Sequence, residues 1–416
     1  MSRTVQMSRH AWLRAAMEAV IQGGPISRAG IAKVTGLSRQ VTADLVLQLV
    51  REGWIKEAAP AANSGEQQAA TYVVAADAAY IASVDLGGTK VRAALTDLAC
   101  NVIGEDVGLT DPRGGADIVA QVAMMCRSIA ARQNIAWERV RLAVIGVPGA
   151  PQSDGRVLLS PNISHFDEFD VGAVFEAALG IDVVLENDVN LAVYGESAAG
   201  AGQEIDNLAF IALGTGVGGG LMLGGELVHG AASAAGELAF LPFGADPFEV
   251  ESLHVGALER VLASFGMKTR YRELSGSGSS VPDIFSRAAA GDTAAEAVLD
   301  ETARYLARGI AAICAVANPQ LVILGGSIGV REELIGRVRA LLPRCMPAAV
   351  EVAASALGAH ASIKGAAALG LKHLHHTLFE PEEPRTKAGA PQGRPDIFQP
   401  SSYREILTVD DPSGGL

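Results

Sequence analysis

The sequence predicts an α/β protein in which a small helical N-terminal domain precedes a body of two similar lobes. Two observations support this prediction. The first 53 residues contain helix-length segments separated by capping residues and glycines. Farther along, residues 80–98 and 207–230 repeat one design of strand, glycine-rich turn and strand. This repetition suggests two lobes that close on one ligand that carries several phosphates.

The composition is that of a folded protein with two or three domains, at roughly 100–200 residues per domain. Of the 416 residues, 49% are hydrophobic and 19% are charged, which permits a sizeable core and excludes general disorder. No apolar run is long enough for a transmembrane helix or has the position of a signal peptide. The four cysteines form no C-x-x-C pair. We therefore expect a reduced, cytoplasmic protein with no membrane partner.

Charge is distributed unevenly along the chain. The net charge of −13 argues against a protein that binds nucleic acid over its whole surface. Residues 1–60, however, carry a net charge of +4, which leaves −17 for the remainder. A basic head on an acidic body is typical of a small DNA-binding module joined to another domain.

Residues 1–75 predict a winged helix-turn-helix. Ser27 and Ser38 are expected to cap the second and third helices, and Gly36 lies in the tight turn between them. The expected elements are helices over 9–22, 28–34 and 39–53 and wing strands over 54–58 and 71–75.

The third helix is expected to enter the major groove of DNA, with Arg39, Gln40 and Thr42 near bases or phosphates. The DNA-binding set also includes residues at the two helix starts, namely Ser27, Arg28 and Ser38. The wing tip, residues 58–70, contains no arginine and so adds little phosphate contact. The alternative is a small helical bundle that docks on a protein.

The body begins with a glycine-rich turn between two strands. The first strand ends near Asp85. Gly87 and Gly88 let the backbone approach a phosphate, while Thr89 and Lys90 supply a hydroxyl and a cation. No helix follows, so the segment is neither a Walker loop nor a dinucleotide fingerprint. Taken alone, it is equally consistent with a plain tight hairpin.

Two later glycine segments complete a candidate nucleotide site. Gly214, Thr215 and Gly216 form the turn of the second hairpin. A third strand ends in Gly325 and Gly326, where glycines permit close packing of a flat ring such as adenine. Together these segments favour binding of a polyphosphate.

In this order, these segments resemble the ROK family (repressor, open reading frame, kinase). The resemblance covers roughly residues 9–376 and rests on DLGGTK, PGAPQSDGRVLLSPN, ENDVN, LGTGVGGGL with the later AGEL, and NPQLVILGG. It implies a two-lobed actin-like/hexokinase (ribonuclease H-like) fold over residues 79–376. The N-terminal helix-turn-helix matches the branch of sugar-responsive transcriptional regulators. Residues 377–416, rich in Pro, Gly and Ser, are expected to form a tail.

The segment Glu186-Asn187-Asp188 follows an apolar strand, which places polar side chains where clefts form. A sugar kinase needs a carboxylate base beside the reacting hydroxyl and amides that hold the others. The resemblance implies Asp188 as that base, Asn162 and Asn187 as sugar-binding amides and Glu237 as a sugar-binding carboxylate. The alternative is that Asp188 caps the following helix, with Glu186 and Asn187 as turn residues.

The chain departs from the family pattern after Glu237. Phe240 stands where the family has the histidine of G-E-I-G-H, which binds zinc and helps to bind sugar. The loop that follows is shorter than the family's C-x-C-G-x-x-G-C-x-E loop and has no cysteine; Glu251 is matched to its final sugar-binding glutamate. No zinc or other metal site is therefore expected, and apolar packing would order the loop.

The first functional hypothesis is a regulator of carbohydrate metabolism that binds operator DNA as a homodimer or homotetramer and responds to a sugar or sugar phosphate. It requires no cofactor. The second is an ATP-dependent sugar kinase with Mg²⁺, or a bifunctional protein, because both glycine-rich turns and Asp188 are present. A docking scaffold is a third possibility. A helix over about 361–375 is expected to pack on the first lobe, with a solvated end at His373, His375 and His376.

Overall fold

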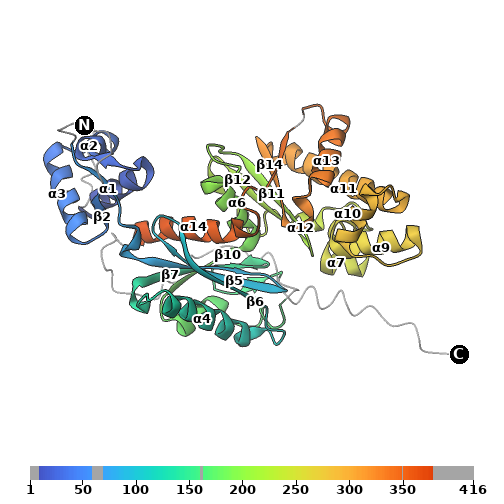
Figure 1. The fold of residues 1–416 in the computed structure, drawn as a ribbon, viewed down its shortest axis with the longest axis horizontal. Helices are drawn as coiled ribbons and strands as arrows, with labels where there is room; N and C mark the ends of the chain where they lie inside the picture. Colours follow the sequence, from blue (N-terminus) through green and yellow to red (C-terminus); the bar gives the residue numbers. More distant parts are fainter. Residues whose placement is uncertain (1–8, 59–68, 160–162, 349, 378–416) are drawn as a thin grey trace. The chain divides into compact units, whose positions relative to one another are not determined.

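The computed structural model describes residues 9–58, 69–159, 163–348 and 350–377 (Figure 1). All of them belong to the compact unit Met1–Glu380. The candidate sugar-binding residue Asn162 and, apart from Thr377, the expected C-terminal tail lie outside the described residues.

Over residues 9–58 and 69–75, the head consists of three helices and a small antiparallel sheet with the strand order β1-β3-β2. The Oγ atom of Ser27 accepts a hydrogen bond from Gly30 N, and that of Ser38 accepts one from Val41 N, so both expected caps are confirmed. Gly36 ends the second helix at φ 71°, a left-handed conformation that favours glycine. The elements are α1 (Arg9–Gly23), β1 (Ile26–Ser27), α2 (Arg28–Thr35), α3 (Arg39–Arg51), β2 (Ile55–Glu57) and β3 (Thr71–Val74).

The first lobe is built on a five-stranded sheet with the order β10-β7-β4-β5-β6. Strands β4, β5 and β6 form an antiparallel meander, whereas β7 and β10 run parallel to β4. The strands are β4 (Tyr80–Leu86), β5 (Lys90–Asp97), β6 (Val102–Leu109), β7 (Val140–Val147) and β10 (Asp182–Asn187). The other elements are η1 (Ala76–Ala78), α4 (Gly115–Arg132), η2 (Trp137–Arg139), β8 (Ala150–Pro151), β9 (Val157–Leu158) and α5 (Val171–Leu179).

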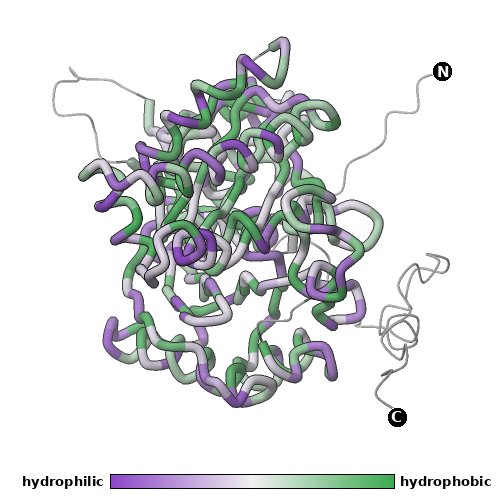
Figure 2. The backbone as a smooth tube through the Cα atoms, turned by 90° about the vertical axis from the view of Figure 1, so that its right-hand side faces the viewer, coloured by the Kyte–Doolittle hydropathy of each residue, from purple (hydrophilic) through white to green (hydrophobic). Residues whose placement is uncertain are grey.

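The second lobe repeats this topology in the sheet order β13-β12-β11-β14-β15. Its strands are β11 (Leu208–Leu213), β12 (Val217–Leu223), β13 (Glu226–Leu227), β14 (Leu321–Gly325) and β15 (Glu351–Ala354). Its helices are η3 (Leu238–Phe240), α7 (Val250–Val255), α8 (Glu259–Leu262), α9 (Ser264–Ser275), α10 (Val281–Ala289), α11 (Thr293–Ala317), α12 (Gly326–Gly329) and α13 (Glu332–Cys345). Hydrophobic and hydrophilic stretches mix along these helices (Figure 2), as expected for helices with one buried face.

Two helices join the lobes. α6 (Asp188–Ala199) packs on β11 and β12 of the second sheet and on β7 and β10 of the first. α14 (Ala361–Thr377), preceded by η4 (Gly358–His360), lies against α6, β4 and β7, so the expected packing on the first lobe is confirmed. A Cβ atom added to Gly365 would lie 1.8 Å from the carbonyl oxygen of Leu191. The backbones of α6 and α14 therefore touch at this crossing.

Candidate functional site

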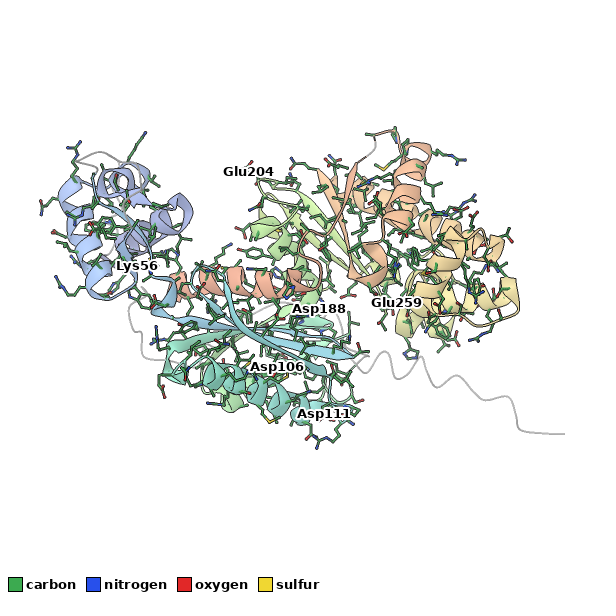
Figure 3. The ribbon with its side chains drawn as sticks, viewed as in Figure 1. Lys56, Asp106, Asp111, Asp188, Glu204 and Glu259 are labelled. Carbon is green, nitrogen blue, oxygen red and sulfur yellow. The ribbon has the colours of Figure 1, made fainter. Side chains whose placement is uncertain are left out.

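Four carboxylates from the two lobes form the candidate site. Asp85 lies near the end of β4, and Asp188 begins α6 directly after β10. Both strands run parallel to β7, so their carboxyl ends meet at one edge of the sheet. Glu237 precedes η3, and Glu259 begins α8. Asp85 and Glu237 interact electrostatically with Asp188, and Glu259 interacts with Glu237 (Asp188 and Glu259 are labelled in Figure 3).

Burial raises the pKa values of all four carboxylates, and a neighbouring carboxylate adds to the effect at Asp188 and Glu237. Burial raises the pKa of Asp188 to about 8, and the negative charges of Asp85 and Glu237 contribute. Burial also raises the pKa of Asp85 to about 6, against the opposing effect of Arg92. The pKa values of Glu237 and Glu259 are raised for the same reason. At neutral pH the site can therefore both donate and accept hydrogen bonds, as a polyhydroxylated ligand requires.

The amide of Asn187 is held by the protein. Its Oδ1 atom accepts hydrogen bonds from Val189 N at 2.9 Å and Asn190 N at 3.0 Å, and its Nδ2 atom donates to Gly149 O at 2.9 Å. Asn187 is thus the N-cap of α6. The alternative expectation assigned this cap to Asp188, but Asp188 is the first residue of the helix.

Glu186 connects the two lobes, a role that the sequence analysis did not predict. Its Oε1 atom accepts hydrogen bonds from Asn187 N at 2.8 Å and Asn190 Nδ2 at 3.0 Å. Its Oε2 atom lies 2.8 Å from Nε2 of His229, which follows β13 in the second lobe. No motif or spacing in the sequence indicates this contact, because the two residues lie 43 positions apart, one in each lobe.

The structure separates Glu251 from the carboxylate group and adds Glu259 to it. The side chain of Glu251 is 78% exposed and pairs with Arg260 at 2.8 Å. Glu259 instead accepts a hydrogen bond from Val217 N at 2.7 Å. A sequence signal for Glu259 exists, because Gly256-Ala257-Leu258-Glu259 has the spacing of G-C-x-E with alanine in place of cysteine.

The two predicted phosphate turns differ in what surrounds them. In the first, Gly87 N donates to Lys90 O at 2.9 Å, and Gly88, Thr89 and Lys90 are exposed. In the second, Gly214 N donates to Gly216 O at 3.0 Å. A Cβ atom on Gly216 would lie 2.8 Å from Oε2 of Glu259, so a carboxylate already lies against this turn.

The glycines of the third predicted segment are required by packing within the protein. A Cβ atom on Gly325 would lie 2.2 Å from the ring of Phe210, and one on Gly326 would lie 2.4 Å from Leu213 O. The flat ring that packs against Gly325 is therefore the side chain of Phe210.

The predicted DNA-binding residues divide into exposed and engaged groups. Arg39 and Gln40 are exposed at the start of α3. Arg28 donates two hydrogen bonds to the hydroxyl of Tyr72, at 3.0 and 2.7 Å. The expectation for Thr42 needs correction, because its side chain is fully buried and its hydroxyl donates to Ser38 O at 3.0 Å.

Among the described residues, no group of three or more His, Cys, Asp or Glu side chains is suited to a metal ion. Phe240 is 41% exposed, and the loop after it contains no cysteine, so the residues present do not fit zinc. In the same part of the chain, no helix combines the length and the hydropathy needed to cross a membrane.

The end of α14 was expected to be solvated, but His375 is buried there. His375 is 7% exposed, and its Nε2 atom lies 2.7 Å from the carbonyl oxygen of Arg14 in α1. The side chain of His376 lies outside the described residues.

Two lobes of duplicated topology around a carboxylate-lined centre define an actin-like, sugar-kinase-like body. The model described as "ROK family" matches residues 81–373, and the chain belongs to this family. The xylose repressor of Bacillus subtilis (strain 168) is 24% identical over 375 residues, which cover 86% of this chain and 94% of the repressor.

Two solved structures have the same fold. One is a ROK family transcriptional regulator described as a homologue of the Escherichia coli MLC protein, with a TM-score of 0.74 and 23% identity; it covers 89% of this chain and 98% of its own. The other is the ROK hexokinase from Thermus thermophilus, with a TM-score of 0.62 and 27% identity, which covers 71% of this chain and 99% of its own. The regulator thus matches a larger share of the chain than the kinase does.

Proposed function

We propose that this protein is a sugar-responsive transcriptional regulator. The head, residues 1–75, would bind operator DNA through Arg39 and Gln40, and the body, residues 79–376, would bind the effector. The greater coverage by the regulators than by the hexokinase supports this proposal. Paired heads in a homodimer or homotetramer would read half-sites about 34–36 Å apart.

One observation carries the proposal: α14 connects the carboxylate site to the head. Near its first residue, Ser362 Oγ donates to the carbonyl oxygen of Asp188 at 3.0 Å. Near its last residue, His375 contacts the carbonyl oxygen of Arg14 in α1 at 2.7 Å. A ligand that displaces Asp188 would therefore move a helix that contacts the DNA-binding head, and a coupling free energy of 1–3 kcal/mol changes affinity about 5–150-fold.

The effector that fits best is a neutral sugar. The site contains Asp85, Asp188, Glu237 and Glu259, whose oxygens bind hydroxyl groups. A phosphate group placed among these carboxylates would be repelled by like charge. We therefore favour a sugar over the sugar phosphate.

The test is fluorescence anisotropy with DNA from the region upstream of the protein's own gene, at fixed salt, with and without pentoses, hexoses and amino sugars. We expect specific binding that one sugar shifts. Arg39→Ala should weaken it about tenfold, whereas Arg113→Ala, an exposed arginine of the body, should not. In His375→Ala, the sugar should still bind, but the affinity for DNA should respond less. Absence of specific DNA binding under every sugar would refute the proposal.

A second candidate function, an ATP-dependent sugar kinase, is favoured by the raised pKa of Asp188. A pKa of about 8 suits a base that accepts a proton near neutral pH. The exposed Thr89 and Lys90 would contact the nucleotide, which with Mg²⁺ supplies the transferable phosphoryl group. Phosphoryl transfer to a sugar that disappears in Asp188→Asn would establish this function.

A further inference from the structure

We propose that His229 and Glu186 form a latch between the two lobes that positions Glu237 beside Asp188. The inference rests on the proposed sugar-binding function of the carboxylate site and identifies what holds that site together. His229 is a positioning residue in this proposal, because it acts through the segment that leads to Glu237.

The first lobe supplies a fixed anchor for the latch. Glu186 is the penultimate residue of β10, and its side chain is only 8% exposed. Its Oε1 atom is held by Asn187 N and Asn190 Nδ2, at 2.8 and 3.0 Å. The Oε2 atom is therefore directed by the same bonds that fix the start of α6, where Asp188 lies.

The second lobe supplies a short loop that joins His229 to Glu237. The loop closes on itself through a hydrogen bond from Ala235 N to His229 O, at 3.1 Å. Its far end rests on β12, because a Cβ atom added to Gly236 would lie 2.5 Å from Gly219 O. A displacement of His229 would thus be transmitted over a few residues to Glu237.

Two bonds tie this loop to the first lobe. His229 Nε2 lies 2.8 Å from Glu186 Oε2, and Gln152 Nε2 donates to Ala232 O at 3.0 Å. The carboxylate of Glu186 raises the pKa of His229, which favours the charged imidazole and a charge-assisted hydrogen bond. Such a bond holds the segment that leads to Glu237 against the first lobe, where the negative charge of Glu237 contributes to the raised pKa of Asp188.

The experiment uses the full chain with His229→Ala, His229→Gln and a matched control, His360→Ala. His360 has the same type of partner, Glu105 at 3.1 Å, and its side chain is similarly exposed (46% against 47% for His229). Glu105 lies in β6, and His360 ends η4 directly before α14, so this pair does not contact the loop that leads to Glu237. The first measurement, made without sugar, is amide hydrogen exchange of residues 228–237. We expect about tenfold faster exchange in His229→Ala, rates near wild type in His229→Gln, which retains an Nε2–H donor, and no change in His360→Ala.

The second measurement is the equilibrium affinity for D-xylose and D-glucose. We expect His229→Ala to bind the preferred sugar about tenfold more weakly and His229→Gln to recover most of the loss. If the wild-type protein binds neither sugar, the proposed binding of these two sugars is refuted. The exchange data still decide whether the latch exists. Equal exchange in wild type and His229→Ala, or a glutamine variant as impaired as the alanine variant, would overturn the latch.

Discussion

The first hairpins of the two lobes have equivalent topology and different chemistry. In the first lobe, the second cross-strand pair from the turn is Asp85 and Arg92, and Asp85 also lies beside Gly146 of β7. In the second lobe, the equivalent positions are Ala212 and Gly218, and Ala212 lies beside Gly325 of β14. Charge therefore occupies this position in one lobe only.

This difference shows that a duplicated sheet does not duplicate its site. The first hairpin contains Asp85, one of the four carboxylates of the candidate site. The second hairpin contains none, and its turn is instead contacted by Glu259 of α8. Equivalent backbone positions thus carry charged residues in the first lobe and small residues in the second. Mutations at matched positions can test what this difference does.

The largest expected effect on stability concerns Gly146 and Gly325, which occupy matched positions beside Asp85 and Ala212. Gly325→Ala should lower the free energy of unfolding by about 3 kcal/mol, because the added methyl group meets the ring of Phe210. Gly146→Ala should cost about half as much, since its nearest obstacle is a methyl group of Leu191 at 2.9 Å. Urea denaturation measures both. Gly336→Ala, with open space around it, should gain up to about 1 kcal/mol; equal losses at the two sites would contradict the comparison.

The next effect is the pH dependence of stability. The pKa values of Asp85 and Asp188, about 6 and about 8, lie above those of an unfolded aspartate, so the folded state binds protons more tightly. Their contribution to stability is complete below about pH 4 and is lost as the pH rises to about 8.

We expect the wild-type protein to lose about 2 kcal/mol of unfolding free energy between pH 6.5 and pH 8. Asp85→Asn should lose about half of that, because Asp85 no longer titrates and the pKa of Asp188 falls when the neighbouring charge is removed. Ala212→Ser, at the matched position of the second lobe, should follow the wild-type profile. Denaturation at several pH values would show it, and an unchanged profile in Asp85→Asn would refute the assigned cause.

The smallest effect separates Glu259 from Glu251. Glu259→Ala removes the acceptor of Val217 N and should cost about 1 kcal/mol of unfolding free energy. Glu251→Ala removes an exposed ion pair and should change stability by less than about 0.5 kcal/mol. Thermal unfolding compares the two variants directly, and a larger loss for Glu251→Ala would reverse our assignment of the second hairpin's partner.

The three helices and two of the three strands of the head were predictable to within about two residues, whereas β1 was missed. Capping by Ser27 and Ser38 connects residues three positions apart, so sequence alone reveals it. Thr42 was assigned to the DNA-binding surface because it is polar. Its spacing to Leu45 and Leu49 nevertheless places it on the buried face of α3.

The candidate site was predictable only in part. Asp85, Asp188 and Glu237 lie in recognisable motifs, and the structure brings them together. Glu251 was matched to the family's final glutamate, and Glu259 was not considered, because the segment has no cysteine to anchor the alignment. The role of Gly325 against Phe210 was missed because the two residues lie on neighbouring strands more than a hundred positions apart.

The sequence by itself determined the capped helices of the head, the two repeated hairpins and the family, because caps, turns and strand patterns depend on residues close together in the chain. The tertiary structure decided which carboxylates share one site, which protons they hold and how α14 connects Asp188 to the head. Burial and the electrostatic coupling between charges depend on distances in space, and only the packed lobes set those distances.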